Sequence, residues 1–227
     1  MDYIDYIADP KRDCVVVAHR GAWRGAPENS LAAIERAIDV GADIVEIDVR
    51  KSADGELFLM HDDTLLRMVG IDRDAETFTM AELQAIALRE DDGGENRGLT
   101  DQRIPTLSQA LEIIRGRIFA DLDLKDRELF PEVAACARTM GAAGFVDLKT
   151  TVMTAEHVAW VKAQNIGEVP FMAMSKFTRE NLHETLSVLS ALKPFMAEIG
   201  FDAVKTIADN RLAFEHAGIA LWKNTLD

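Results

Sequence analysis

Residues 19–30 read HRGAWRGAPENS and residues 46–62 read EIDVRKSADGELFLMHD, with a helical segment between them. The apolar run Cys14–Ala18 before the first motif is typical of a buried parallel strand. Asn29 or Ser30 can cap the helix that follows. The two motifs therefore predict a strand, a helix, a second strand, a tight turn and a third strand, with polar residues gathered where strands end.

The second strand carries two acids that alternate with apolar residues. The apolar residues of Ile44–Val49 would face one side of the sheet, and Glu46 and Asp48 the other. Two carboxylates on one face of an apolar strand need a cation if they are buried, because an unpaired buried charge is costly. Oxygen ligands of this kind suit Mg²⁺ or Ca²⁺ better than Zn²⁺. Alternation alone also allows an exposed strand face with two solvated acids.

Asp54 and Gly55 are a strong tight-turn signal between the second and third strands. With these two residues as the whole loop, counting back along both strands places Asp48 opposite His61. The turn would then bring His61 beside a candidate metal ligand. A further histidine, His19, follows the first strand, at the end where barrels place their catalytic residues.

The ordered pattern H-R-G, P-E-N-S, E-I-D, D-G and H-D resembles the signature of the glycerophosphodiester phosphodiesterase family. The resemblance is dense over Val15–Arg67 and reappears near Asp121–Lys125. Residues 221–225 (LWKNT) are similar to the family's late W-x-N-T element. The resemblance implies a hydrolase that cleaves a small-molecule glycerophosphodiester to glycerol 3-phosphate and an alcohol, with a divalent metal ion, Mg²⁺ or Ca²⁺.

The resemblance also implies roles for individual residues. The metal ligands would be Glu46, Asp48 and Asp123, and the acid–base pair would be His19 and His61.

Four further residues would surround the substrate. The resemblance implies that Arg20 and Lys125 neutralise the phosphate, and an arginine can do so with two hydrogen bonds. It places Glu28 near the site, where it would orient Arg20, and makes Trp222 a wall of the site. A helix-dipole partner is the equal alternative for Glu28, and core packing is the alternative for Trp222.

The third metal ligand departs from the family pattern. The family usually carries Glu-x-Lys where this chain has Asp123 and Lys125, and Asp is one methylene shorter. The change would move the ion or alter its preference. Asp121, one pleat deeper on the same face, is the competing ligand.

Strands that alternate with helices along the rest of the chain predict parallel crossover units, and 227 residues suit one domain. We therefore expect an α/β fold, a TIM-type (β/α) barrel that forms a single domain over residues 1–227. A small inserted segment, Asp63–Pro105, would follow the second strand and take part in substrate selection.

The strand count falls one short of a closed barrel. Parallel strands are expected to begin near residues 14, 43, 118, 144, 168, 195 and 218, which makes seven, whereas the family normally has one more strand after the W-x-N-T element. The last strand is thus missing from the predicted barrel. Either the sequence is truncated, or the barrel is open, or a neighbouring chain fills the gap in a homo-oligomer. An open barrel would expose two unpaired edges.

Composition restricts the partners and the compartment. The 25 Lys and Arg residues against 39 Asp and Glu give a formal net charge of −14, which argues against nucleic acid and anionic membranes as partners. The first 13 residues do not resemble a signal peptide, and no apolar run is long enough to span a membrane. Cys14 and Cys136 are predicted to be buried thiols, in keeping with a reducing compartment, the cytoplasm.

Two other functions stay open at this point. A lysophospholipase D- or sphingomyelinase D-like phosphodiesterase on the same barrel should show an apolar entrance. A degenerate barrel that binds phosphodiesters without cleaving them would fit the missing strand, but the complete set of histidines and acids opposes it.

Overall fold

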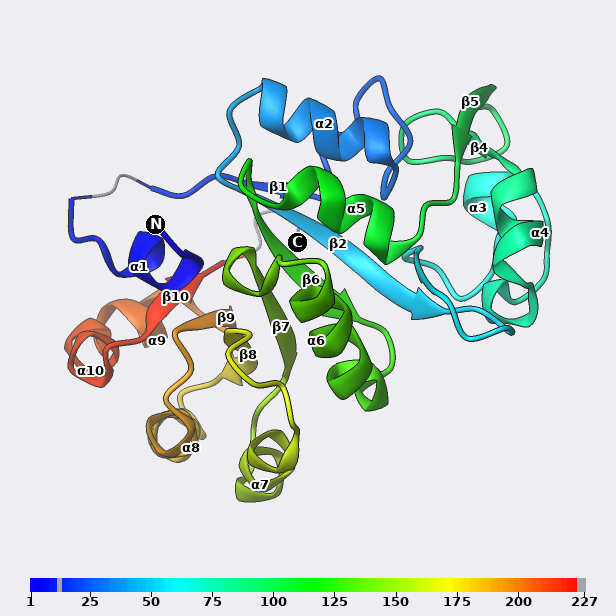
Figure 1. Ribbon diagram of the computed structural model, residues 1–227. Coiled ribbons are helices and arrows are strands. Elements are labelled where there is room, and N and C mark those ends of the chain that lie inside the picture. Colours follow the sequence, from blue (N-terminus) through cyan, green and yellow to red (C-terminus); the bar gives the residue numbers. More distant parts are fainter. Residues whose placement is uncertain (12–13, 224–227) are drawn as a thin grey trace.

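The computed structural model describes residues 1–11 and 14–223, and its main sheet curls into most of a barrel (Figure 1). Within these residues, seven strands run parallel in the order β1-β2-β6-β7-β8-β9-β10, and β3 pairs antiparallel with β2. The strands are β1 (Val17–His19), β2 (Ile44–Lys51), β3 (Leu57–Leu59), β6 (Phe119–Leu124), β7 (Val146–Thr151), β8 (Phe171–Phe177), β9 (Met196–Phe201) and β10 (Ala220–Trp222). The expected TIM-type α/β architecture is confirmed.

Helices lie around the outside of this sheet and join its successive strands (Figure 1). They are α2 (Leu31–Asp39), α5 (Leu107–Ile114), α6 (Phe130–Thr139), α7 (Ala155–Ala163), α8 (Leu182–Leu192), α9 (Val204–Ala208) and α10 (Arg211–Ala217), with single 3₁₀ turns at Arg127–Leu129 and Ala143–Phe145. Apolar faces of α2, α5 and α6 bury Ile34, Leu111 and Val133 against the apolar side of β2 and β6. Among the described helices, none combines the length and apolar composition that crossing a bilayer requires.

The barrel is open between β1 and β10, which do not pair with each other within the described residues. Pairing of β1 with β2 begins only at Val17, opposite Ile44, so the first strand is shorter than the predicted Cys14–Ala18. The prediction that Cys14 is buried is wrong, because this residue precedes the paired part of the strand and is exposed. Cys136, on α6, is half-buried.

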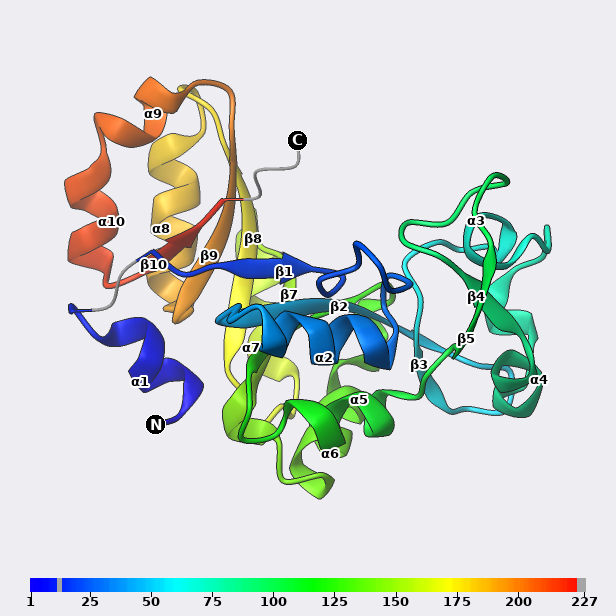
Figure 2. The same cartoon turned by 90° about the horizontal axis from the view of Figure 1, so that it is seen from above.

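The inserted segment has a small core of its own. It consists of α3 (Leu66–Val69), a 3₁₀ turn at Ala75–Thr77, α4 (Met80–Ala85) and the two-stranded sheet of β4 (Ala87–Arg89) and β5 (Leu99–Arg103). Met68, Leu83 and Leu88 form a buried cluster there with Phe58 of the hairpin. Figure 2 shows the segment beyond the carboxyl ends of β1 and β2, which is the end where parallel barrels hold their sites.

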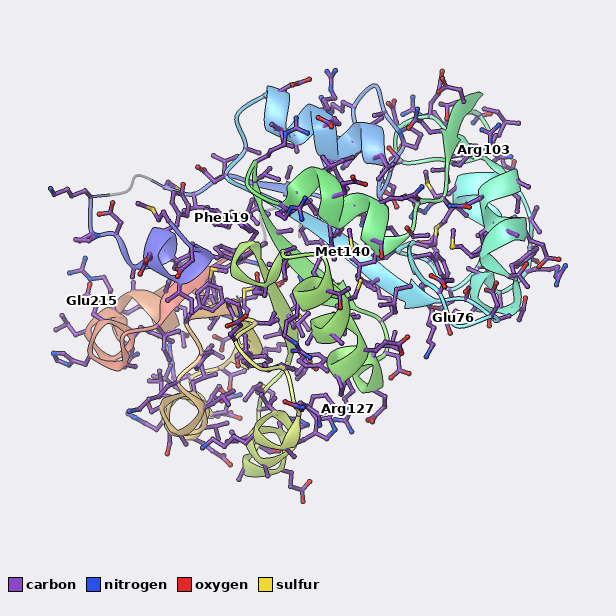
Figure 3. All side chains as sticks on the ribbon, in the orientation of Figure 1. Glu76, Arg103, Phe119, Arg127, Met140 and Glu215 are labelled. Atoms are coloured by element: carbon purple, nitrogen blue, oxygen red, sulfur yellow. The ribbon has the colours of Figure 1, made fainter. Side chains whose placement is uncertain are left out.

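Helix α1 (Tyr3–Ala8) lies at the opposite end, beside the starts of the strands (Figure 2). Tyr3 is fully buried. Its ring stacks on Phe119, with 4.7 Å between centroids, and meets Phe195 edge-on at 5.2 Å. Phe119 opens β6 and is labelled in Figure 3. The helix therefore closes the amino end of the sheet with aromatic packing.

We expect Tyr3→Ala to lower the free energy of unfolding by about 3–5 kcal/mol, the usual range for truncation of a buried aromatic side chain. Urea denaturation of the variant and the wild type measures the difference. The matched control is Ile4→Ala on the same helix, where the side chain is 45% exposed and the expected change is within about 0.5 kcal/mol. Equal stability of the two variants would show that α1 does not hold the sheet.

Candidate active site

The parallel register of β2 and β6 places acidic residues side by side. Glu46 lies opposite Asp121, and Asp48 lies opposite Asp123. One carboxylate oxygen from each of Glu46, Asp48 and Asp123 lies within 4.8 Å of the other two. Glu46 and Asp48 are almost completely buried. The fold thus brings together the three acids that the sequence predicted as metal ligands.

Asp121, the alternative third metal ligand, forms an ion pair with Lys149 and is not part of the acid cluster. It is fully buried, and its carboxylate lies 2.7 Å from Nζ of Lys149 on β7. Lys149 also lies 3.3 Å from Glu198 and 3.9 Å from Glu46. Burial raises the pKa of Asp121 well above its usual value, and Lys149 only partly opposes this effect. Lys149 was not predicted as a site residue, although its alternation with Asp147 on one strand was a signal.

Cations surround the buried Asp48. Nζ of Lys125 lies 2.6 Å from Asp48 Oδ1 and 2.8 Å from Asp123 Oδ2, and Nε of Arg20 lies 3.6 Å from Asp48 Oδ2. Burial alone would raise the pKa of Asp48, but Lys125 and Asn29 outweigh it and the pKa falls below its usual value. For Glu46, burial and the neighbouring Asp48 charge raise the pKa well above normal. The acids therefore form a cluster whose negative charge is only partly balanced.

Asn29, just before α2, forms two hydrogen bonds with Asp48. Its Nδ2 donates to Asp48 Oδ2 at 2.6 Å, and the Asp48 backbone N–H donates to Asn29 Oδ1 at 3.0 Å. Asn29 has φ of +55°, a left-handed conformation that asparagine tolerates better than most residues. The helix cap is Ser30, which accepts from the Ala33 N–H. Asn29 therefore supports Asp48, whereas the sequence analysis named this residue only as a possible helix cap.

The predicted pairing of Asp48 with His61 is wrong by one residue. Val49 pairs with Leu59, and the Met60 N–H donates to the Asp48 carbonyl at 3.1 Å, so Asp48 lies opposite Met60. The reason is the loop: a two-residue type I′ turn needs positive φ at both Asp54 and Gly55, but only Gly55 has it (φ of +91°), so the loop has three residues. Ser52 and Glu56 therefore pair across the loop, and each partner shifts by one position.

His61 nevertheless reaches the same cavity as His19, because the chain leaves β3 after Leu59. This open cavity, of about 1050 Å³, is also lined by the three clustered acids. Nε2 of His19 lies 3.9 Å from Glu46 Oε2. Burial and the charge of Arg20 lower the pKa of His19 below its usual value, which favours the neutral imidazole.

Trp222 lies at the cavity wall. It is half-buried on β10 and lines the cavity together with Lys149, whose Nζ lies 5.6 Å from the centre of the Trp222 ring. Asn224 and Thr225, the other defined positions of the W-x-N-T element, lie outside the described residues.

Glu28 lies between two arginines. Its Oε2 is 3.2 Å from Arg20 Nη1, and its Oε1 accepts from Arg67 Nη2 at 2.6 Å. Glu28 is 3% exposed and precedes the first turn of α2. This position fits the orientation of Arg20 better than a helix-dipole contact.

Asp62 connects Arg67 to His61. Nδ1 of His61 lies 2.7 Å from Asp62 Oδ1, and Arg67 donates to both Asp62 oxygens, from Nε at 2.7 Å and from Nη2 at 2.8 Å. Burial alone would raise the pKa of Asp62, but the bonds from Arg67 and His61 lower it to about 2. Sequence reasoning assigned no role to Asp62 or Arg67; the H-D pair was the available signal.

The low pKa of Asp62 predicts a pH-dependent contribution to stability. Because the folded-state pKa of about 2 lies below the ordinary value of 3.8, the contribution is complete above about pH 4 and is lost as the pH falls through about 2. We expect the difference in unfolding free energy between the wild type and Asp62→Asn to shrink over this range, as urea denaturation at successive pH values would measure. Asp101→Asn, at an exposed position of β5, is the control and should show no such trend.

Comparison with known proteins places these features in one family. Residues 19–138 match the model of the Glycerophosphoryl diester phosphodiesterase family. A glycerophosphodiester phosphodiesterase of Caldanaerobacter subterraneus is 36% identical over 107 residues, which are 46% of this chain and 42% of that protein. Human glycerophosphodiester phosphodiesterase 1 is 36% identical over 110 residues, which are 46% of this chain and 31% of that protein. The matches thus span less than half the length of these relatives.

Solved structures agree over nearly the whole chain. A glycerophosphoryl diester phosphodiesterase from Parabacteroides distasonis superposes with a TM-score of 0.73 at 25% identity, over 96% of this chain and 75% of that one. An Oleispira antarctica phosphodiesterase in complex with the product sn-glycerol-3-phosphate gives 0.67 at 26% identity, over 94% of this chain and 85% of that one. The family model covers more than half of the 227 residues, including both motifs that frame the acid cluster, and the chain therefore belongs to the glycerophosphoryl diester phosphodiesterase family.

Proposed function

We propose that the chain is a metal-dependent phosphodiester hydrolase that cleaves glycerophosphodiesters to glycerol 3-phosphate and an alcohol. The observation that carries this proposal is the convergence of three acids and two histidines on one cavity, with the cationic side chains of Arg20 and Lys125 in contact with one of those acids, Asp48. The product named in the Oleispira antarctica structure supports the substrate class.

The acid cluster fits a divalent ion such as Mg²⁺ or Ca²⁺. Its donors are carboxylate oxygens from Glu46, Asp48 and Asp123, which hard cations prefer. Burial, and after it repulsion by Asp48, raises the pKa of Glu46, and an added positive charge would oppose both effects. When bound, the ion would polarise a phosphoryl oxygen and hold a substrate hydroxyl.

Arg20 and Lys125 are the proposed phosphate-binding residues. Arg20 is fixed by Glu28 and Asp48 beside the acid cluster, and its guanidinium can hold two phosphate oxygens at once. Lys125 adds a second positive charge next to Asp123. Together they would offset the substrate charge that the acids repel.

His19 and His61 are the proposed acid–base pair. One would take the proton from the nucleophile, and the other would give a proton to the leaving oxygen of the alcohol. The nucleophile is either the glycerol hydroxyl of the substrate, which would form a cyclic phosphate, or water. Trp222 would form one wall of the site. The inserted segment 63–105 would take part in substrate selection. Barrel and inserted segment would together form a single domain.

The compartment we propose is the cytoplasm. The two cysteines are free, and no disulfide is formed among the described residues, which favours a reducing environment.

Release of glycerol 3-phosphate from glycerophosphocholine and glycerophosphoethanolamine tests the function. The expected result is turnover that a chelator abolishes and added Mg²⁺ or Ca²⁺ restores. Lysophosphatidylcholine in detergent serves as the comparison substrate. Turnover of that lipid alone would contradict the proposed substrate class, chelator-resistant turnover would contradict the metal, and binding without turnover would identify a non-catalytic barrel.

A further inference from the structure

Arg67 belongs to the inserted segment, yet it contacts two residues that hydrogen-bond to site residues. It lies on α3, outside the barrel strands. Its guanidinium binds Asp62, the partner of His61, and Glu28, the partner of Arg20. A single side chain thus links the proposed proton-transfer residue with the proposed phosphate-binding residue.

We propose that Arg67 is a positioning residue that holds both of these groups in their working orientation. Through Asp62 it fixes the ring of His61, and through Glu28 it fixes the guanidinium of Arg20. Its catalytic consequence rests on the function proposed above, whereas its effect on the His61 ring does not.

The contact with Asp62 decides which nitrogen of His61 carries the proton. Asp62, with a pKa of about 2, is a carboxylate near neutral pH and can only accept a hydrogen bond. Nδ1 of His61, 2.7 Å away, must therefore be the donor. In the neutral ring this leaves Nε2 as the acceptor, and His61 lines the cavity that holds the acid cluster.

The geometry of Arg67 requires a guanidinium. Nε and Nη2 bind the two oxygens of Asp62, Nη2 also binds Glu28 at 2.6 Å, and Nη1 donates to the Asp92 carbonyl. All three nitrogens are thus engaged in different directions. A lysine carries a compact charge without this planar fork, so it can replace only part of the arrangement.

The loop between β4 and β5 holds Arg67 and the Glu28 segment together. Asp92 of this loop accepts from Arg67, and the neighbouring Asp91 accepts from the backbone N–H groups of Gly25 and Glu28 at 2.6 and 2.9 Å. The inserted segment therefore contacts the Glu28 side of the site at the backbone as well as through Arg67. This explains how a residue outside the strands can be held firmly enough to orient others.

Kinetics of Arg67→Gln, Arg67→Lys and Arg67→Ala, measured as glycerol 3-phosphate release from glycerophosphocholine, test the proposal. We expect Arg67→Gln to lower kcat/KM by roughly ten- to a hundredfold, the usual effect of losing a residue that orients site residues. Arg67→Lys should recover part of this loss. Guanidinium ion, well below denaturing concentrations, should restore activity to Arg67→Ala because the side chain is 30% exposed.

The matched control is Arg73→Gln. Arg73 lies in the same inserted segment and packs its guanidinium over the Phe78 ring at 4.2 Å, away from Asp62 and Glu28. It should keep wild-type kinetics and should not respond to guanidinium. An equal loss in Arg73→Gln and Arg67→Gln, or no rescue of Arg67→Ala, would reduce Arg67 to general support of the inserted segment and overturn the proposal.

Nitrogen-15 NMR of His61 gives a readout that does not depend on activity. The wild type should show the neutral ring protonated at Nδ1, and Arg67→Gln should show a mixture of the two tautomers. An unchanged ring in Arg67→Gln would overturn the positioning of His61 even if activity falls. If the wild type releases no glycerol 3-phosphate, the proposed function fails, while the NMR comparison still decides whether Arg67 orients His61.

Discussion

His61→Ala is expected to lower kcat by about 10²- to 10⁴-fold, the usual contribution of a general acid or base. KM should change little, because a proton transfer stabilises the transition state and not the bound substrate. His61 lines the cavity that contains the acid cluster, and its Nδ1 is held by Asp62, so the ring is oriented before substrate arrives. Steady-state kinetics on glycerophosphocholine measures both constants.

His183→Ala is the matched control for this experiment. His183 lies on α8, exposed on the outside of the barrel, where a histidine has no access to the cavity. Its loss should leave kcat unchanged. If His61→Ala also kept full activity, an acid–base role of His61 would be excluded, and another group in the cavity would have to transfer the proton.

Asp48→Asn is expected to abolish divalent-ion binding and to lower kcat/KM on the order of 10³-fold, since a bound ion supplies several kcal/mol of transition-state stabilisation. The substitution preserves shape and removes one charge from a residue that is 1% exposed. It also leaves Lys125 with a neutral neighbour at a contact of 2.6 Å. Isothermal titration with Mg²⁺ and Ca²⁺, followed by kinetics, measures the two effects.

Asp121→Asn separates metal binding from the general loss of a buried charge. Asp121 is as deeply buried as Asp48, but it pairs with Lys149 and lies outside the ligand cluster. Its substitution should reduce stability and leave metal affinity within a fewfold of the wild type. The reverse outcome, with metal binding lost in Asp121→Asn and kept in Asp48→Asn, would make Asp121 the ligand and move the ion one pleat deeper.

Local patterns predicted a pair of acids on each of two strands, whereas the choice of Asp123 as the third member of the acid cluster came from the family resemblance. Glu46 and Asp48 alternate on one strand, Asp121 and Asp123 alternate on another, and parallel pairing in the same register makes them neighbours. The seven-strand count followed from the same alternation of strands and helices. Both inferences depend on a periodicity that a short window of sequence contains.

The supporting residues could not be found in this way. Asn29 bonds Asp48 across 19 positions, and Arg67 bonds Glu28 across 39. No periodicity relates such partners, because tertiary structure decides which of them meet: the position of α2 beside β2 for Asn29, and the fold of the inserted segment for Arg67. The predicted hairpin register was wrong for a smaller reason: a Gly at the end of a loop suits both two- and three-residue turns, and only the backbone conformation of the preceding residue, Asp54, distinguishes them.

The separate core of residues 63–105 has a consequence for chimeric proteins. Because its buried cluster, which includes Met68, Leu83 and Leu88, is distinct from the barrel core, a donor segment from a relative can be grafted with few compensating changes in the barrel. On the roles proposed above for the inserted segment in substrate selection and for Arg67 in positioning, a graft without an arginine at this position would lower turnover. Transfer of this segment is therefore limited by its ionic contacts with the barrel, those of Arg67 with Glu28 and of Arg50 with Asp63 and Glu76, and by its packing on Phe58.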